Sequence, residues 1–167
     1  MTTYESVGKV AKPNNPIFQS GKKLKTTRFR KTITDAESEA NDLYILGGPY
    51  TYDDRLDSIE GSNPAQTSNN DADLGFYKKN EDGTYSAIDA DILWDGANLT
   101  SAITYRNLLT HLNSALDTTK NIGELLGLGS DSEPQGGVYV GLLNKVASTG
   151  GTLILELKVN IDEATTN

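Results

Sequence analysis

The sequence predicts a mostly β protein, an antiparallel β-sandwich with one helical insert and an extended N-terminal arm. Sixteen glycines and many Asn, Asp, Ser and Thr residues favour turns and short strands over long helices. Short apolar stretches alternate with polar loops, without the regular strand–helix order of a parallel α/β sheet. The length of 167 residues fits one domain with an appendage.

Seven stretches have the composition of strands, either alternating in polarity or continuously apolar. The predicted strands cover residues 27–33, 42–46, 55–60, 73–79, 85–88, 138–143 and 153–159. Gly47-Gly48-Pro49 should end the second strand, and Asp82-Gly83 marks a hairpin turn between the fourth and the fifth. The last two strands flank a Ser-Thr-Gly-Gly turn and are expected to pair as an antiparallel hairpin.

One helical insert is predicted, at about residues 98–126. Asn98 can cap a helix whose leucines approximate one face as far as Leu116. A further turn is expected from about residue 119 to Leu126, where Gly127 ends it.

The charge of the chain is unevenly distributed. Residues 1–31 hold eight basic residues and one acidic residue, Glu5, for a net charge of +7. Since the whole chain has a net charge of −8, the remaining 136 residues have a net charge of −15. Residues 1–26 have no sustained period and contain Pro13, Pro16 and Gly21, which predicts an extended basic arm. The predicted organisation is this arm, a body at residues 27–162 and a C-terminal tail at residues 163–167.

The arm mixes basic and apolar side chains, which favours docking on a protein surface. Nucleic acid is disfavoured because only Phe29 is interleaved for base stacking and the acidic body would repel a polyanion. A site on an acidic protein surface fits better. The predicted docking residues are Ile17, Phe18, Lys22, Lys23, Leu24, Lys25, Arg28 and Arg30.

No motif in the chain predicts an enzyme, a cofactor or a metal site. There is no cysteine, so thiol chemistry is excluded. His111 is the single histidine; a Ser-His-Asp triad is recognised by geometry and stays open, but no G-x-S-x-G elbow accompanies His111, which favours a structural or exposed histidine. The acidic run around Asp89 and Asp91 fails the EF-hand spacing, and turn carboxylates that bind their own backbone explain it better than calcium does. No window is apolar enough for a transmembrane helix, and no apolar signal segment stands at the N-terminus.

The body resembles accessory head proteins of tailed bacteriophages. The resemblance lies in DAESEANDLYIL at residues 35–46, RLDSI at residues 55–59, DLGFY at residues 73–77 and ASTGGTLILELKV at residues 147–159. It covers about residues 27–162 and implies a jelly-roll-like sandwich whose last strand follows the Thr-Gly-Gly turn. The lysine-rich arm and the helical insert depart from the family pattern, which leaves the docking mode open.

This resemblance implies a capsid decoration or cement protein on the outer surface of the virion, made in the host cytoplasm. Its partners would be the major capsid protein, copies of itself or other virion proteins, with no membrane involved. One alternative is a neck or tail component of the same virion class. Another is a carbohydrate-binding surface module, which would need exposed aromatic side chains; the candidates are Tyr50, Tyr52, Tyr85 and Trp94.

Overall fold

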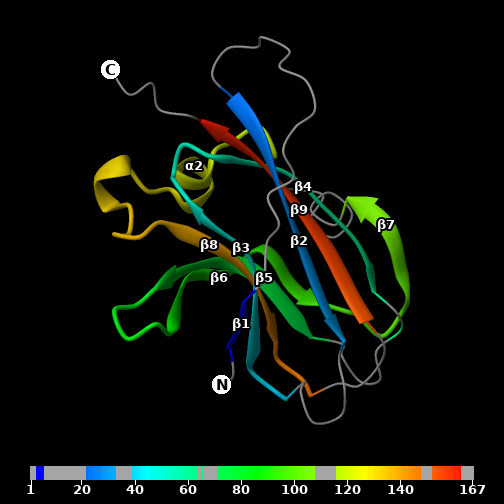
Figure 1. Ribbon diagram of the computed structural model, residues 1–167. Helices are drawn as coiled ribbons and strands as arrows, with labels where there is room; N and C mark the ends of the chain where they lie inside the picture. Colours follow the sequence, from blue (N-terminus) through cyan, green and yellow to red (C-terminus); the bar gives the residue numbers. More distant parts are fainter. Residues whose placement is uncertain are drawn as a thin grey trace.

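In the computed structural model, the described part of the chain (residues 3–5, 22–32, 39–63, 65, 71–107, 116–147 and 152–162) forms two β-sheets (Figure 1). The strands are β1 Thr3–Glu5, β2 Lys22–Thr32, β3 Asp42–Tyr50, β4 Arg55–Asn63, β5 Ala72–Lys79, β6 Tyr85–Ala97, β7 Ile103–Asn107, β8 Val138–Asn144 and β9 Thr152–Asp162. One sheet has the order β1-β3-β8-β5-β6, and the other has the order β2-β9-β4-β7. The predicted mostly β fold is confirmed.

Most neighbouring strands pair antiparallel, and β1 is the parallel exception beside β3. From β2 onward, successive strands alternate between the two sheets, except that β5 is followed by its own neighbour β6. Each alternation carries the chain across the sandwich, so strands adjacent in sequence face one another instead of pairing.

The main core lies between the two sheets. Its members are alternate residues of the strands, because side chains along a strand point to opposite faces in turn. The five-stranded sheet contributes Tyr44, Leu46, Phe76, Val140 and Leu142, and the four-stranded sheet contributes Leu56, Ile59 and Leu157.

A smaller apolar cluster lies on the opposite face of the five-stranded sheet. Leu43 and Ile45, which alternate with the core residues of β3, pack there with Tyr77 and Tyr85. The register between β5 and β6 shifts around Gly75 of β5, where β6 has extra residues. A Cβ at Gly75 would overlap the backbone of Asp89 and Ala90 in β6. The close backbone approach explains the glycine at that position.

Five predicted strands are confirmed and extend beyond their predicted ends, namely β4, β5, β6, β8 and β9. The Asp-Gly hairpin turn between β5 and β6 is also confirmed. Gly83 N–H donates to the carbonyl of Asn80 at 3.0 Å, and Gly83 has a φ of 84°. Strand β3 continues through Gly47-Gly48-Pro49 to Tyr50, so the prediction that this triplet ends the strand was wrong. The register of β3 against β8 shifts on both sides of Gly47, which accommodates the break in alternation.

The predicted hairpin between the last two strands was also wrong. Strand β8 lies between β3 and β5, whereas β9 lies between β2 and β4 in the other sheet. The two strands therefore belong to different sheets, where each gains a buried face and two ladder neighbours; residues 148–151, expected to form the hairpin turn, lie outside the described residues.

The helical prediction is confirmed at its C-terminal end and was wrong at residues 98–107. Ile103–Asn107 is β7, paired with β4, and 98–102 is irregular, while residues 108–115 lie outside the described residues. Helix α2 is Ile122–Leu126. Asn121 and Glu124 form its capping box, and Gly127, with a φ of 66°, ends it as predicted.

The N-terminal segment also differs from the expectation of an arm without packed elements. Strand β1 pairs with β3, and β2 begins at Lys22, five residues before the predicted start at Thr27. Ladder hydrogen bonds join backbone groups, so Lys22–Thr26 pairs with β9 although polar and apolar residues do not alternate in its sequence.

Candidate docking surfaces

Strand β2 is the basic edge of the four-stranded sheet. It holds six basic residues and no acidic one, namely Lys22, Lys23, Lys25, Arg28, Arg30 and Lys31. All eleven residues are in register with β9, from Lys22 opposite Asp162 to Thr32 opposite Thr152. Within the described ranges, β9 is its one ladder neighbour, so the second backbone edge of β2 faces away from the sheet.

The two arginines of β2 are displayed on the surface. Arg28 and Arg30 are exposed, while Thr27 between the two sheets is buried. This is the alternation of a strand with one buried face. Lysine and arginine on an edge strand are common because they discourage unspecific strand pairing. Two exposed arginines on a paired strand also give a partner surface a defined register.

The structure places six of the eight predicted docking residues on β2 itself, namely Lys22, Lys23, Leu24, Lys25, Arg28 and Arg30. Ile17 and Phe18 lie outside the described residues, as does the predicted tail. These six residues therefore lie on a strand that is paired with β9 of the body.

Acidic residues gather in a second surface, which we call the acidic cap and define as residues 51–54 and 116–135. The cap has six carboxylates and one basic residue, Lys120, for a net charge of −5. Its carboxylate residues are Asp53, Asp54, Asp117, Glu124, Asp131 and Glu133. Asp53 and the buried Asp54 lie in the turn after β3, Asp117 lies before α2, Glu124 lies in α2, Asp131 lies in η1 (Ser130–Ser132), and Glu133 follows η1 directly.

Hydrogen bonds join the two segments of the cap into one unit. Ile122 N–H donates to the carbonyl of Asp54 at 2.9 Å, and Gly123 N–H donates to the carbonyl of Tyr52 at 3.0 Å. Tyr52 N–H donates to Oε2 of Glu133 at 3.0 Å, and the Tyr52 hydroxyl lies 3.3 Å from the carbonyl of Ser132. Burial, with the Glu133 charge, raises the pKa of Tyr52.

One glycine, Gly123, and the main core hold this unit against the body. A Cβ on Gly123 would lie 3.0 Å from Cβ of Tyr52, so the helix approaches the turn as closely as glycine allows. Tyr52 and Ile122 are buried in the main core. The cap is thus a fixed part of the sandwich, not a loose loop.

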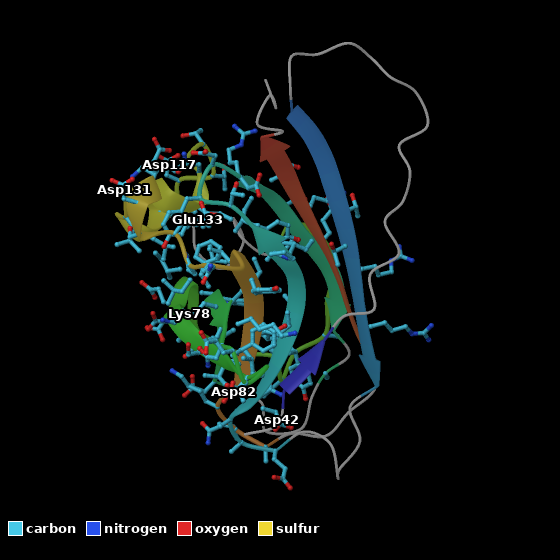
Figure 2. The ribbon with its side chains drawn as sticks, turned by 60° about the vertical axis from the view of Figure 1, so that its left-hand side comes forward. Asp42, Lys78, Asp82, Asp117, Asp131 and Glu133 are labelled. Carbon is cyan, nitrogen blue, oxygen red and sulfur yellow. The ribbon has the colours of Figure 1, made fainter. Side chains whose placement is uncertain are left out.

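The basic edge and the acidic cap lie on opposite sides of the molecule. Figure 2 shows Asp117, Asp131 and Glu133 on the left of the molecule and β2 on its right. The basic and acidic segments of the sequence therefore lie on different sides of the folded molecule.

A third charged group, around Lys145, has a structural role. Nζ of Lys145 lies 2.7 Å from Asp73, 3.6 Å from Asp71 and 3.9 Å from Asp95. The buried Asp73 also accepts the N–H of Gly96 at 3.0 Å. The hydrogen bond to Asp73 raises the pKa of Lys145. This network neutralises a buried carboxylate between β5, β6 and β8.

Two other candidate sites came from the sequence, a calcium site around Asp89 and Asp91 and a catalytic site at His111. The described part of the chain supports neither. Asp89 and Asp91 are close enough to share a hydrogen bond, and burial together with this bond raises the pKa of Asp89. No group of three or more metal-ligating side chains comes together within the described ranges. His111 lies outside them. No described helix is long and apolar enough to cross a membrane.

The four aromatic residues proposed for carbohydrate binding are buried. Tyr50 is 1%, Tyr52 2%, Trp94 5% and Tyr85 7% exposed. Three of them belong to the main core, and Tyr85 packs edge to face on Tyr139 with ring centroids 5.1 Å apart. None of the four rings is exposed to a sugar. The aromatic residues on which the carbohydrate-binding alternative rested are therefore packed in the interior.

Sequence reasoning found the basic residues of β2, although it placed Lys22–Thr26 in an arm, and it missed the cap. Its carboxylates are spread over two segments more than sixty residues apart, and neither segment is a charge run. The one local signal was the spacing of Asn121 and Glu124, which matches a capping box.

Comparison with known proteins gives one structural likeness. No family model matches the chain, and no curated protein matches it. A chain of the capsid of Ralstonia phage GP4 has a similar structure, with a TM-score of 0.52, over 98% of this chain and 100% of that chain. The two are 13% identical, so the likeness is one of fold.

Proposed function

We propose that this chain is a virion structural protein that binds the assembled capsid shell and stabilises it, as a decoration or cement protein. The observation that carries the proposal is the basic edge strand on a sandwich that is otherwise acidic. The fold likeness to a chain of a phage capsid supports the same assignment. The proposal gives the chain no catalytic role and no cofactor.

The strand order supports a jelly roll, the sandwich that recurs in viral capsid and lectin domains. If β1 is set aside, the orders β2-β9-β4-β7 and β3-β8-β5-β6 are those of two interlocked Greek keys. Strand β1 would then be an addition to the edge beside β3. We interpret the fold as a jelly roll on this basis.

The proposed mechanism is physical. The cations of β2 meet an acidic protein surface at the shell, while Ile17, Phe18 and Leu24 bury apolar area at about 25 cal/mol per Å². A single contact of this kind is modest, but many copies on one lattice act together. The acidic body stays on the outer surface of the virion, where its charge keeps particles apart. The major capsid protein is the proposed partner, met in the host cytoplasm during assembly.

The test is binding of the purified chain to shells that lack it, measured by co-sedimentation. Deletion of residues 1–26 would remove part of β2 and damage the fold, so substitutions are the better probe. Arg28→Glu with Arg30→Glu should weaken binding about tenfold or more, and Ile17→Ser with Phe18→Ser should also weaken it. The control is Lys78→Glu with Lys79→Glu, which makes the same charge change on the exposed end of β5.

Binding that survives both substitutions in β2 would contradict the docking role of the strand. Failure of the unchanged chain to bind any shell would contradict the decoration role. The number of copies per particle separates decoration from a neck or tail position, because a closed ring holds few copies and a shell surface holds many.

A further inference from the structure

We infer that neighbouring copies of this chain exchange their N-terminal strands, so that β1 of one copy pairs with the edge of β3 in the next. In the single chain the strand is closed on its own copy, where β1 pairs with β3. The exchanged form makes the same ladder between two copies. The inference rests on the proposed function in one respect, because a shell surface would hold the copies side by side.

Strand β1 is an addition to a sandwich that is built from the other described strands. The sets β2-β9-β4-β7 and β3-β8-β5-β6 form the two layers, and β1 lies outside both at the edge of β3. Its ladder has three residue pairs and is parallel, whereas the other described ladders are antiparallel. Moving β1 to another copy would therefore leave the ladders of both layers in place.

The edge of β3 needs a strand beside it. Among the described strands, β8 pairs with β3 on one side and β1 pairs with it on the other. The residues opposite β1 are Leu43, Tyr44 and Ile45, which are all buried. An open strand edge is a template for pairing with another chain. A strand added from a second copy satisfies this edge through the same main-chain hydrogen bonds.

Strand β1 lies at the opposite end of the sandwich from the start of β2. It pairs with the first residues of β3, which begins at Asp42, ten positions after β2 ends at Thr32. Figures 1 and 2 show β1 in the lower part of the molecule and the start of β2 at its top. Eleven residues at a rise of about 3.3 Å each put the two ends of β2 roughly 33 Å apart. A connection within one copy therefore covers about the length of the sandwich.

The number of residues between the two strands allows either connection. Glu5 ends β1 and Lys22 begins β2, so sixteen residues, 6–21, join them; they lie outside the described residues. Sixteen residues reach at most about 55 Å. This exceeds the length of β2 by about 20 Å, which is more than the roughly 10 Å between packed sheets. The β3 edge of a copy packed alongside is therefore within reach.

The exchange conserves the ladder, so its main cost is the freedom that two copies lose when they are held together. A shell that holds the copies side by side has already removed that freedom, and the neighbouring edge is then present at a high effective concentration. We therefore expect the exchanged form on particles and the closed form in dilute solution. Each exchanged strand links one copy to the next.

The test is a disulfide at a register pair of the ladder. The chain has no cysteine, and Glu5 stands opposite Ile45, within the distance that a disulfide spans between neighbouring strands. Glu5→Cys with Ile45→Cys in one chain should give a ladder of linked copies on a denaturing gel after oxidation on shells. The closed form would give an intrachain bond and a monomer. The control is Glu5→Cys with Thr51→Cys, because Thr51 is exposed in the turn after β3, outside the register of β1. The linked species should exceed those of the control about tenfold or more.

A mixture of two single variants gives a second readout. Glu5→Cys in one chain and Ile45→Cys in the other cannot form an intrachain bond, so the mixed dimer reports exchange alone. It should exceed both like-with-like dimers. Thr3→Cys and Leu43→Cys form a second register pair, to be used if Ile45→Cys prevents folding.

Three results would overturn the inference: monomers with an intrachain bond on shells, a ladder of equal strength in the control, or no excess of the mixed dimer. Co-sedimentation of the same samples with shells separates the two proposals. Shell binding with monomers alone would refute strand exchange and leave decoration standing. A ladder in concentrated solution, on the order of 100 μM, without shell binding would refute decoration and leave strand exchange standing.

Discussion

The backbone N–H of Tyr52 donates a hydrogen bond to Oε2 of Glu133, 3.0 Å away and 81 residues further along the chain. This bond joins the turn after β3 to the segment that follows α2. A carboxylate that accepts a backbone N–H at a partly buried position makes a stronger bond than a neutral pair. The acidic cap therefore depends on one carboxylate that also contributes to its charge.

Replacing that carboxylate should loosen the cap. Glu133→Ala should lower the free energy of unfolding by about 1.5 kcal/mol, because the buried N–H of Tyr52 loses a charged acceptor. Urea unfolding measures the change. Glu133→Gln, which keeps an acceptor, should cost less, and the exposed neighbour Asp131→Ala is the control with the same loss of charge. An equal effect of all three would mean that charge, and not the bond, matters.

The crossing of β6 over Gly75 should tolerate no side chain. Gly75→Ala should destabilise the fold by about 3 kcal/mol, because the new methyl overlaps backbone atoms of Asp89 and Ala90 that cannot rotate away. Gly129→Ala is the matched control, since its Cβ would meet nothing within 4 Å and its φ is ordinary. The control should stay within about 0.5 kcal/mol of the unchanged chain. Thermal unfolding of both variants decides the point.

The ion pair between β4 and β9 should make stability depend on pH in the acid range. Nζ of Lys158 lies 2.9 Å from Oε1 of Glu60, and this hydrogen bond lowers the pKa of Glu60 from 4.5. A lowered carboxyl pKa gives stability that is present above pH 4.5 and is lost as pH falls through the folded-state pKa. The side chains are 24% and 39% exposed, so the gain is only about 0.5 kcal/mol.

The comparison for this pair is Lys158→Met against the unchanged chain, unfolded in urea across the acid range. The difference in stability should be present at neutral pH and should shrink as Glu60 becomes protonated. A difference that stays constant through the acid range would show that Lys158 acts through packing and not through its charge.

The buried phenol of Tyr50 should titrate late. Burial raises the pKa of Tyr50 from 10.0 to about 12. Since the unfolded chain loses this proton near pH 10, the stability is complete below pH 10 and declines as pH rises toward 12. Ultraviolet absorbance of tyrosinate follows the titration of the eight tyrosines. Tyr50→Phe should remove one late step; loss of an early step instead would contradict the burial.

The positions of most strands could be read from the sequence. Residues 138–143 and 153–159 were predicted, and the strands are Val138–Asn144 and Thr152–Asp162. Alternation and continuous apolar runs carry this information because each residue of a strand meets one face of the sheet or the other. The stop of α2 at Gly127 was equally local, since a left-handed φ suits glycine.

Which strands pair with one another was harder to predict from the sequence. The hairpin expected between β8 and β9 rested on their nearness in sequence, but in this sandwich successive strands cross to the opposite sheet. Residues 103–107 showed a spacing compatible with a helix, yet pairing with β4 made them a strand. Ladder bonds to a neighbour outweigh the small differences in local propensity.

The sequence by itself determined the composition of this protein: a mostly β chain, with strands near the predicted places and its positive charge concentrated before residue 32. Only the tertiary structure decided how that charge is used. The ladder with β9 fixed the basic residues on a rigid edge, and the bond from Tyr52 to Glu133 gathered distant carboxylates into a cap on the far side. Charge is counted along the chain, but attraction between charges depends on distance, and distance is set by packing.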